Sequence, residues 1–384
     1  YVPPYVNLGN LYRLMGKIEE SELVLRKIID AGVNLPDAYN SLAATLEFKR
    51  LSDEAEQFYK KALEADPQHI DARNNLGAIN FKKKDFANAW KLRESRWDKL
   101  KYKMEMKRFK NPTWQMERVD TLFVWAEQGV GDQIMFAPCL HELKKFANHL
   151  IVSLEDKLIP LFERSFQHQM SFVSRYEDVN NIAFDAHVPA MTAFGYFRKS
   201  LDQFRRAQKP YMVPCPDRSA EFRQELEILA EGRRIVGISW FTKAVIVGSW
   251  RCVPLADLVA NIPEDIFLVN LQYGDVAEDI RTLKRTSGRD IYQVNDLDPF
   301  EDLDGLAALV SACDSVISVD NVTVHLAGSL GQSSEVLLPF RGDWRWGNPT
   351  DSKSLMYNDM TLHRQEEHMS WTGCLASLRT SFSD

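Results

Sequence analysis

The stretch 312–331 constrains the fold of this chain more than any other part of its sequence. The run Ser315–Val319 predicts a short buried strand, Asp320 and Asn321 end it, and the apolar residues that follow have helical spacing. The first backbone N–H groups of such a helix would lie at the carboxyl end of a parallel sheet, where phosphate is stabilised. An ordinary β-α unit, in which Asp320 or Asn321 only caps the helix, explains the pattern equally well.

A second strand, turn and helix occupies residues 121–136, where an apolar run leads into Gly129, Gly131 and Asp132. The two glycines would let the backbone turn tightly and approach a ligand closely. The dinucleotide fingerprint GxGxxG is absent, because Asp132 follows Gly131 and no third glycine comes after it. A carboxylate would repel a pyrophosphate, so Asp132 fits a general base that faces an acceptor hydroxyl. Two such units predict two Rossmann-like domains that face a cleft.

Residues 1–98 contain an internal repeat with a period of 34 residues. Equivalent positions hold matching residues, namely Leu8, Leu42 and Leu76, and Ser21, Ala55 and Ala89. Small residues where two helices cross are typical of tetratricopeptide repeats, whose first helices line a concave face. Five asparagines fall on those first helices: Asn7, Asn10, Asn40, Asn74 and Asn75. Their amides fit an extended peptide backbone, although helix capping and solvation explain them equally well.

Several short segments then occur in an order that resembles a known family. They are residues 111–114, 124–136, 236–240, 270–272, 318–328, 337–340 and 343–346. Together they resemble the tetratricopeptide-containing glycosyltransferases related to the bacterial heptosyltransferase group, glycosyltransferase family 9, over most of residues 90–375. The resemblance implies a GT-B fold, a nucleotide-sugar donor held by the second domain, and inversion at the anomeric carbon. It also implies no catalytic metal and no cofactor.

The expected elements divide the chain into four parts. These are repeats at 1–98, a basic connector at 99–118, an N-terminal Rossmann-like acceptor domain at 119–215 and a C-terminal Rossmann-like donor domain at 216–384. The connector is more typical of a solvated helix face than of a site for an acidic partner. Expected strands are Thr121–Trp125, Leu150–Leu154, Ser171–Val173, His187–Val188, Arg234–Trp240, Ile266–Leu271, Ile291–Val294, Ser315–Val319 and Glu335–Leu338. A helix is expected over Ile134–Phe146, since the two kinds of element alternate as in a parallel sheet.

The candidate donor-site residues lie after the strands of the second domain. They are Lys243, Arg251, Gln272, Asp320, Asn321, Val322, Thr323 and His325. A cation in the loop after the first strand would offset pyrophosphate charge, and the resemblance assigns this role to Arg251, three residues before Pro254. The resemblance also supports Gln272 and His325, although a helix histidine fits core packing equally well. The run 244–248 is apolar, whereas the family usually carries polar and basic residues there.

Composition limits the remaining possibilities. The chain of 384 residues has a net charge of −7, which argues against general nucleic-acid binding, and no apolar run long enough to span a bilayer. Its five cysteines are scattered, without the spacing of a zinc site, and predict reduced thiols in the cytoplasm. The chain begins at Tyr1 inside a repeat, so we expect sequence upstream of it. Trp344, Arg345 and Trp346 are expected to pack the C-terminal segment onto the fold.

The leading hypothesis is a cytoplasmic, inverting glycosyltransferase that uses a nucleotide-sugar donor. Asp132 would take a proton from the acceptor, and the repeats would present a peptide, protein or glycan acceptor. A non-catalytic tetratricopeptide scaffold with a degenerate transferase domain is the alternative, which the apolar run 244–248 favours. A nicotinamide-dependent oxidoreductase is disfavoured, because GxGxxG and the ribose-binding acid are both missing.

Overall fold

The computed structural model describes residues 3–32, 34–166, 170–243 and 248–382, which form two compact units. Unit 1 comprises Tyr1–Arg108, Lys199–Leu201 and Arg341–Asn348, and unit 2 comprises Phe109–Arg198, Asp202–Phe340 and Pro349–Asp384. Both Rossmann-like sheets belong to unit 2. The boundaries at 98, 118 and 215 remain predictions.

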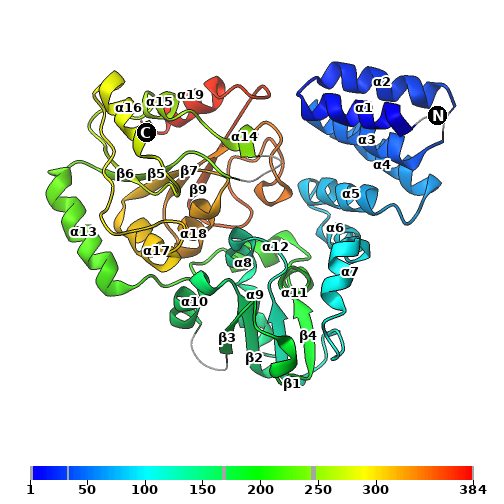
Figure 1. Ribbon diagram of the computed structural model, residues 1–384, viewed down its shortest axis with the longest axis horizontal. Helices are drawn as coiled ribbons and strands as arrows, with labels where there is room; N and C mark the ends of the chain where they lie inside the picture. The colour runs from blue at the N-terminus through cyan, green and yellow to red at the C-terminus, as the bar shows by residue number, and fades with distance from the viewer. Residues whose placement is uncertain (1–2, 33, 167–169, 244–247, 383–384) are drawn as a thin grey trace. The chain divides into compact units, whose positions relative to one another are not determined.

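Unit 1 is built from helical hairpins (Figure 1). Its helices are α1 (Pro3–Leu14), α2 (Ile18–Asp30), α3 (Pro36–Phe48), α4 (Ser52–Ala65), α5 (Ile70–Lys82), α6 (Phe86–Arg93), η1 (Glu94–Asp98) and α7 (Leu100–Met106). A Cβ added at Gly9 would lie 2.7 Å from Leu25 Cγ, so only glycine lets α1 and α2 approach this closely. Ser21 Oγ donates to Gly9 O across the same crossing at 2.8 Å. The predicted helical repeats are confirmed.

The last hairpin packs against the segment Arg341–Asn348, which belongs to unit 1 although it follows a strand of unit 2 in sequence. Within it, η4 (Trp344–Trp346) places Trp344 parallel to Phe81, with ring centroids 4.1 Å apart, and edge-on to Trp90 at 5.5 Å. Trp344 is therefore a core residue of the repeats, where burial of its large ring stabilises the end of the array.

The first sheet of unit 2 is parallel, with strand order β3-β2-β1-β4. Its strands are β1 (Val119–Trp125), β2 (Ala147–Leu154), β3 (Met170–Ser174) and β4 (Ala186–Pro189). The connecting helices are α8 (Val130–Phe136), α9 (Cys139–Leu143), η2 (Asp156–Leu158), α10 (Ile159–Ser165), η3 (Val179–Asn181), α11 (Ala190–Tyr196) and α12 (Leu201–Ala207). The chain order reverses between β1 and β4, and the glycine turn follows β1 at this switch point.

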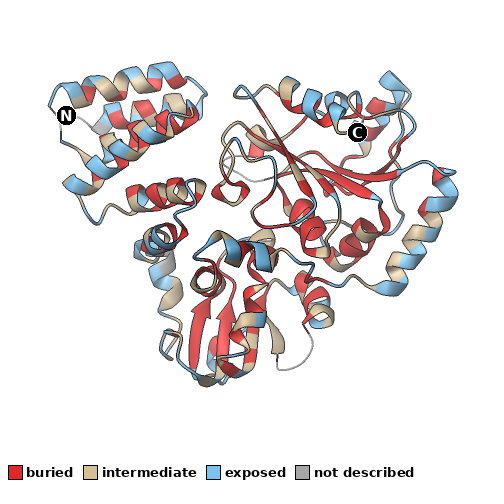
Figure 2. Ribbon diagram, turned by 180° about the vertical axis from the view of Figure 1, so that it is seen from behind, coloured by how far each residue is buried: buried red, intermediate tan, exposed pale blue. Residues whose placement is uncertain are grey.

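The second sheet is also parallel, with strand order β6-β5-β7-β8-β9. Its strands are β5 (Ile235–Ser239), β6 (Phe267–Asn270), β7 (Ser315–Val319), β8 (Ser334–Leu338) and β9 (Met360–Arg364). Its helices are α13 (Pro216–Ala230), α14 (Gly248–Arg251), α15 (Leu255–Val259), α16 (Ala277–Ser287), α17 (Leu303–Ala312), α18 (Val322–Leu330) and α19 (Thr372–Thr380). Strands β5 and β7 are wholly buried, whereas most of α13 faces solvent (Figure 2). Helical repeats followed by two Rossmann-like sheets confirm the predicted fold class.

Two sequence expectations about single elements are wrong, and one strand was not predicted. The helix expected over Ile134–Phe146 is two helices, because Pro138 lies between α8 and α9 and cannot donate the N–H that a continuous helix needs. The expected strand Ile291–Val294 is only a single bridge, from Tyr292 to Val269. Strand β9 was not expected, because its five residues include polar His363 and Arg364.

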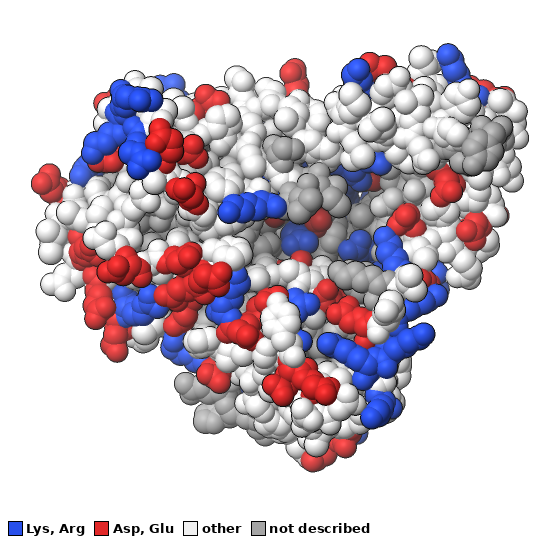
Figure 3. Space-filling model, in the orientation of Figure 1, with Lys and Arg blue, Asp and Glu red and all other residues white. Residues whose placement is uncertain are grey.

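Acidic and basic side chains are interspersed on the face of the protein shown in Figure 3. Within the ranges that the structure describes, no helix is long and apolar enough to cross a membrane.

Candidate functional site

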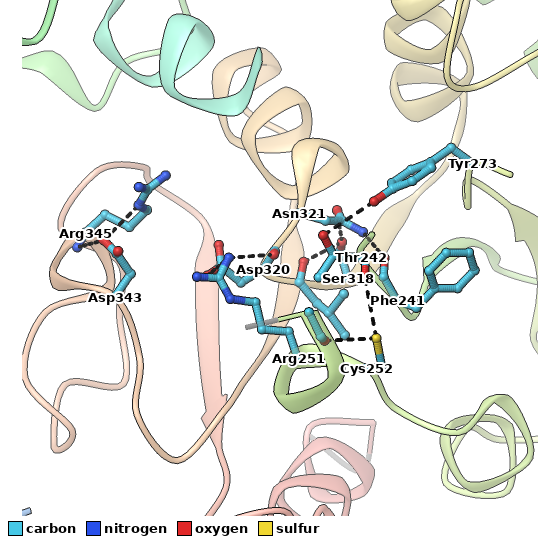
Figure 4. Close-up of polar contacts among 12 residues, drawn as sticks. Phe241, Thr242, Arg251, Cys252, Tyr273, Ser318, Asp320, Asn321, Asp343 and Arg345 are labelled. Atoms are coloured by element: carbon cyan, nitrogen blue, oxygen red, sulfur yellow. Dashed lines mark hydrogen bonds and ion pairs between the residues drawn. The ribbon is translucent and has the colours of Figure 1, made fainter. Parts of the chain in front are cut away.

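The loops after β5 and β7 meet at the carboxyl end of the second sheet, where the chain order reverses (Figure 4). Asn321 follows β7, and its Nδ2 donates to Ser239 Oγ at 2.7 Å and to Phe241 O at 3.1 Å. Open α/β sheets bind ligands at such a switch point. The structure therefore brings together the two loops that carry most of the expected donor residues.

Asn321 caps helix α18. Its Oδ1 accepts the backbone N–H of Thr323 at 3.0 Å and the hydroxyl of Ser318 at 3.1 Å, and the side chain is buried. A carboxamide oxygen at this position satisfies one of the N–H groups that begin a helix. The capping alternative thus describes the geometry, and the Thr323 N–H that was expected to meet a phosphate already has a partner. Val322 is the first residue of α18.

Arg251, at the end of α14, forms an ion pair with Asp320. Arg251 Nη1 lies 3.0 Å from Asp320 Oδ2, and the Asp320 side chain is only 3% exposed (Figure 4). Both residues were expected to serve a donor, but their charges offset each other in this arrangement. Arg251 would have to exchange Asp320 for a phosphate before it could stabilise a leaving diphosphate.

Gln272 holds the end of β5. Its Oε1 accepts Ser239 Oγ at 2.9 Å and the backbone N–H groups of Trp240 at 2.8 Å and Phe241 at 2.9 Å. Its Nε2 donates to Tyr273 O at 3.2 Å, and the residue is 1% exposed. These bonds make Gln272 a brace between neighbouring strand ends.

A cavity of about 470 Å³ lies beside these loops, beyond the carboxyl end of β6. It is lined by Lys243, Asn270, Gln272, Gly274, Asp275, Gln293, Val294, Leu297, Asp298, Pro299, Phe300 and Leu309. Its volume lies within the range of small-molecule sites. Lys243 is exposed, and its Nζ lies 3.1 Å from where a Cβ on Gly274 would be. The cation therefore stands at the wall of the cavity.

The sequence did not point to the 293–300 part of the cavity wall, because that segment has no motif. The signal present was a polar turn after the expected strand, in which Asp298 Oδ1 accepts Phe300 N at 2.8 Å. Most of the apolar run 244–248 lies outside the described residues, and only Gly248 belongs to a described element, α14.

The glycine turn after β1 begins α8, with Gly129 as its N-cap and Asp132 in its first turn. Asp132 is half-buried. Glu127, to which the sequence analysis assigned no role, is buried just after β1, and its Oε1 accepts the N–H of Met191 at 3.2 Å. The turn thus carries two carboxyl groups. Glu127 is hydrogen-bonded to α11, and Asp132 lies on the first turn of α8 at the sheet edge.

His325 packs against this glycine turn. A Cβ added at Gly131 would lie 2.6 Å from His325 Cδ2, and the ring is 3% exposed. His325 Nδ1 lies 2.9 Å from the Tyr357 hydroxyl, and Tyr211 donates to Ile134 O of α8 at 2.9 Å. Burial, with a smaller contribution from Tyr357, holds the pKa of Tyr211 well above its usual value, so its hydroxyl remains a donor. The two Rossmann-like halves of unit 2 thus meet at His325.

No group of three or more His, Cys, Asp or Glu side chains suited to a metal ion occurs in the part of the chain that the structure describes. The five cysteines are all free thiols.

Comparison with known proteins gives the following similarities. The family model described as Tetratricopeptide repeat matches residues 2–31 and 36–69, which confirms the repeats. Protein FlbA of Caulobacter vibrioides is 32% identical over 234 residues, which are 55% of this chain and 38% of that protein. The Type IV pilus assembly protein PilF of Pseudomonas aeruginosa is 29% identical over 97 residues, which are 25% of this chain and 38% of that protein. The chain therefore spans well under half the length of both relatives.

Among solved structures, the glycosyl transferase family 9 protein from Veillonella parvula is similar over 69% of this chain and 92% of its own. The identity is 12% and the TM-score is 0.47. The elements of this chain are helical repeats followed by two parallel α/β sheets.

Proposed function

We propose that this protein is an inverting glycosyltransferase that moves a sugar from a nucleotide-sugar donor to an acceptor hydroxyl without a catalytic metal. The observation that carries the proposal is the cavity of about 470 Å³ at the carboxyl edge of the second sheet, with Lys243 at its wall. The volume suits a nucleoside, and a cation next to it suits the phosphates. Asp275 and Asp298 also line the cavity and are suited to accept hydrogen bonds from ribose hydroxyls.

On the donor side, the nucleoside would occupy the cavity and the diphosphate would extend along the loop after β5 toward the end of β7. Lys243 would meet its charge first. Arg251 would contribute once a phosphate oxygen replaces Asp320, and the two neighbouring strand ends are braced in place by Gln272. Charge that develops on the leaving diphosphate is stabilised best by groups already in position.

On the acceptor side, Asp132 would accept the proton of the acceptor hydroxyl as its oxygen bonds to the anomeric carbon. The bond from that carbon to the diphosphate oxygen breaks in the same step, and the nucleoside diphosphate leaves. Attack from the face opposite the leaving group inverts the anomeric configuration. The placement of Asp132 on the first turn of α8, at the edge of the other sheet, supports this role.

The repeats would bind the acceptor, which we propose is a peptide or protein, because arrays of this kind present an extended concave surface. The five free thiols fit a reducing compartment, and we propose the cytoplasm.

The test is thermal unfolding of the full chain with nucleoside diphosphates, with and without a chelator, followed by a transfer assay that detects the released diphosphate. Binding of a ligand to the folded state raises the melting temperature. We expect a shift that survives the chelator, and release of diphosphate when acceptor is present. A shift seen only with added metal would overturn metal independence, and binding without transfer to any acceptor would favour the scaffold alternative.

A further inference from the structure

Charged side chains lie near the carboxyl ends of the first helices of all three hairpins in unit 1. Arg13 is in the last turn of α1, Glu47 is next to the end of α3, and Lys82 ends α5. Arg341, from the segment that packs within unit 1, joins them. These four residues are called the Glu47 cluster.

The cluster contains more cations than its single carboxylate can neutralise. Glu47 Oε1 accepts Lys82 Nζ at 3.0 Å, and its Oε2 accepts Arg341 Nη2 at 3.2 Å. With Arg13 the cluster holds three cations and one anion, so its net charge is positive. Glu47 is 2% exposed, whereas Lys82 is 13% and Arg341 is 28% exposed, so Arg341 is the most accessible of these three side chains.

Arg13 is the cation of the cluster for which no ion pair occurs among the described residues, although the charge of Glu47 acts on it in the direction that raises its pKa. Its Nη2 donates to Asn10 Oδ1 at 3.2 Å, and its buried Nε has no hydrogen-bond partner among the described residues. Its guanidinium lies 5.8 Å from the centre of the Phe48 ring, and that of Arg341 lies 4.8 Å from the same ring. Burial and the charge of Arg341 lower the pKa of Arg13. Two guanidinium groups beside one ring form a site that an added anion would stabilise.

Amide side chains extend the site along two helices. Asn40 precedes Glu47 by two helical turns on α3, and Asn75 precedes Lys82 by two turns on α5, so each pair lies on one helix face. Asn75 Nδ2 donates to Asn40 Oδ1 at 3.1 Å, which places the amides side by side. Carboxamides can both donate to and accept from a peptide backbone.

We propose that the Glu47 cluster binds an acidic side chain of an extended peptide whose backbone lies along the amides of Asn40 and Asn75. This deepens the proposed role of the repeats in acceptor binding, but it concerns binding alone and does not require sugar transfer. The chemistry recognised is a carboxylate held by guanidinium groups. Free phosphate could supply the same anionic oxygens, so the experiment separates the two sources.

The probe is a short fluorescein-labelled oligoglutamate peptide, with an oligoglutamine peptide of equal length for comparison. Fluorescence anisotropy with the full chain should show binding of the first that weakens with salt, and far weaker binding of the second. Inorganic phosphate and sodium chloride are then compared at equal ionic strength. Phosphate should displace the oligoglutamate peptide no better than chloride does. Stronger competition by phosphate, or equal binding of both peptides, would overturn the proposal.

The variants are Arg13→Gln and Arg341→Gln, with Lys27→Gln on the exposed face of α2 as the control for loss of one positive charge. Each cluster variant should weaken oligoglutamate binding about tenfold or more, because a hydrogen bond to a charged group is lost. Arg13→Gln should keep or raise the melting temperature, since it relieves repulsion from Arg341. Weakening by Lys27→Gln as large as by Arg13→Gln would mean a general charge effect and would refute the site.

Discussion

Glu47→Gln should destabilise the repeats more than any exposed charge substitution in them. The Glu47 carboxylate accepts hydrogen bonds from Lys82 at 3.0 Å, Arg341 at 3.2 Å and the Tyr59 hydroxyl at 2.8 Å. Glutamine keeps the volume but loses the charge, and its amide group would place N–H donors against these donors. Lys82 and Arg341 would then be left without their counter-ion.

The magnitude follows from the pKa of Glu47, which its cationic partners lower from 4.5 to about 2 although burial alone would raise it. A shift of this size corresponds to about 3 kcal/mol in the free energy of unfolding. Removal of one partner from a buried pair typically costs about 3–5 kcal/mol, which agrees. Since the folded-state pKa is depressed, this stabilisation is complete above the unfolded pKa near 4.5 and is lost as the pH falls toward 2.

Hydrogen exchange measured by mass spectrometry is the suitable assay, because it reports each helix separately and we do not expect a chain with two units to unfold in one step. At pH 7, Glu47→Gln should reduce the protection of amides in α3 and α5, and the difference from the parent protein should shrink below pH 4.5. Glu64→Gln, at an exposed position on α4, is the matched control. Unchanged protection in Glu47→Gln at pH 7, or an equal effect of Glu64→Gln, would refute the reasoning.

Other substitutions test the rest of the molecule. Asp132→Asn should lower the rate of transfer by about 10²- to 10⁴-fold and spare nucleotide binding in the thermal shift assay; normal turnover would remove Asp132 from the mechanism. Lys243→Gln should weaken nucleoside diphosphate binding about tenfold, as measured by titration calorimetry with Lys209→Gln as the control. Equal affinities of the two variants would mean that the cavity is not the binding site. Gly131→Ala should lower the melting temperature, because its Cβ would lie 2.6 Å from the His325 ring. Trp344→Ala should lower the free energy of unfolding of the repeats by about 3–5 kcal/mol, because a large buried ring is removed. Hydrogen exchange should then show reduced protection of α5 and α6. Unchanged protection of both helices would contradict the place of Trp344 in the repeat core.

The fold could be predicted from the sequence where a pattern repeats or where apolar strands alternate with helices. The 34-residue period predicted the helical hairpins, because the small residues it marks lie where two helices cross, as at Ser21, whose Oγ donates to Gly9 O. Strand β9 was not predicted, because the burial of its polar residue His363 depends on partners that are distant in sequence. Its ring nitrogens lie 2.8 Å from Ser377 Oγ and 2.6 Å from Glu335 Oε2, on two other elements.

The candidate site was predicted as a set of positions but not as a set of contacts. The sequence placed Arg251, Asp320 and Gln272 near one sheet edge, which the strand order bears out. It could not show that Arg251 pairs with Asp320 or that the Gln272 oxygen is used by three donors, since these partners are far apart in sequence. Side chains suited to bind phosphate or sugar are equally suited to bind each other.

The two glycines of the first turn now have different physical explanations. Glycine at 131 is needed by packing, because a Cβ there would enter the space of the His325 ring. A Cβ at 129 would meet only Asp132 Oδ2, at an ordinary distance of 3.8 Å, and Gly129 has a φ of −69°, which any residue adopts. Among the described residues nothing requires glycine at 129. Close approach of a ligand to the backbone at Gly129 stays a prediction, whereas Gly131 and His325 set the distance between α8 and α18.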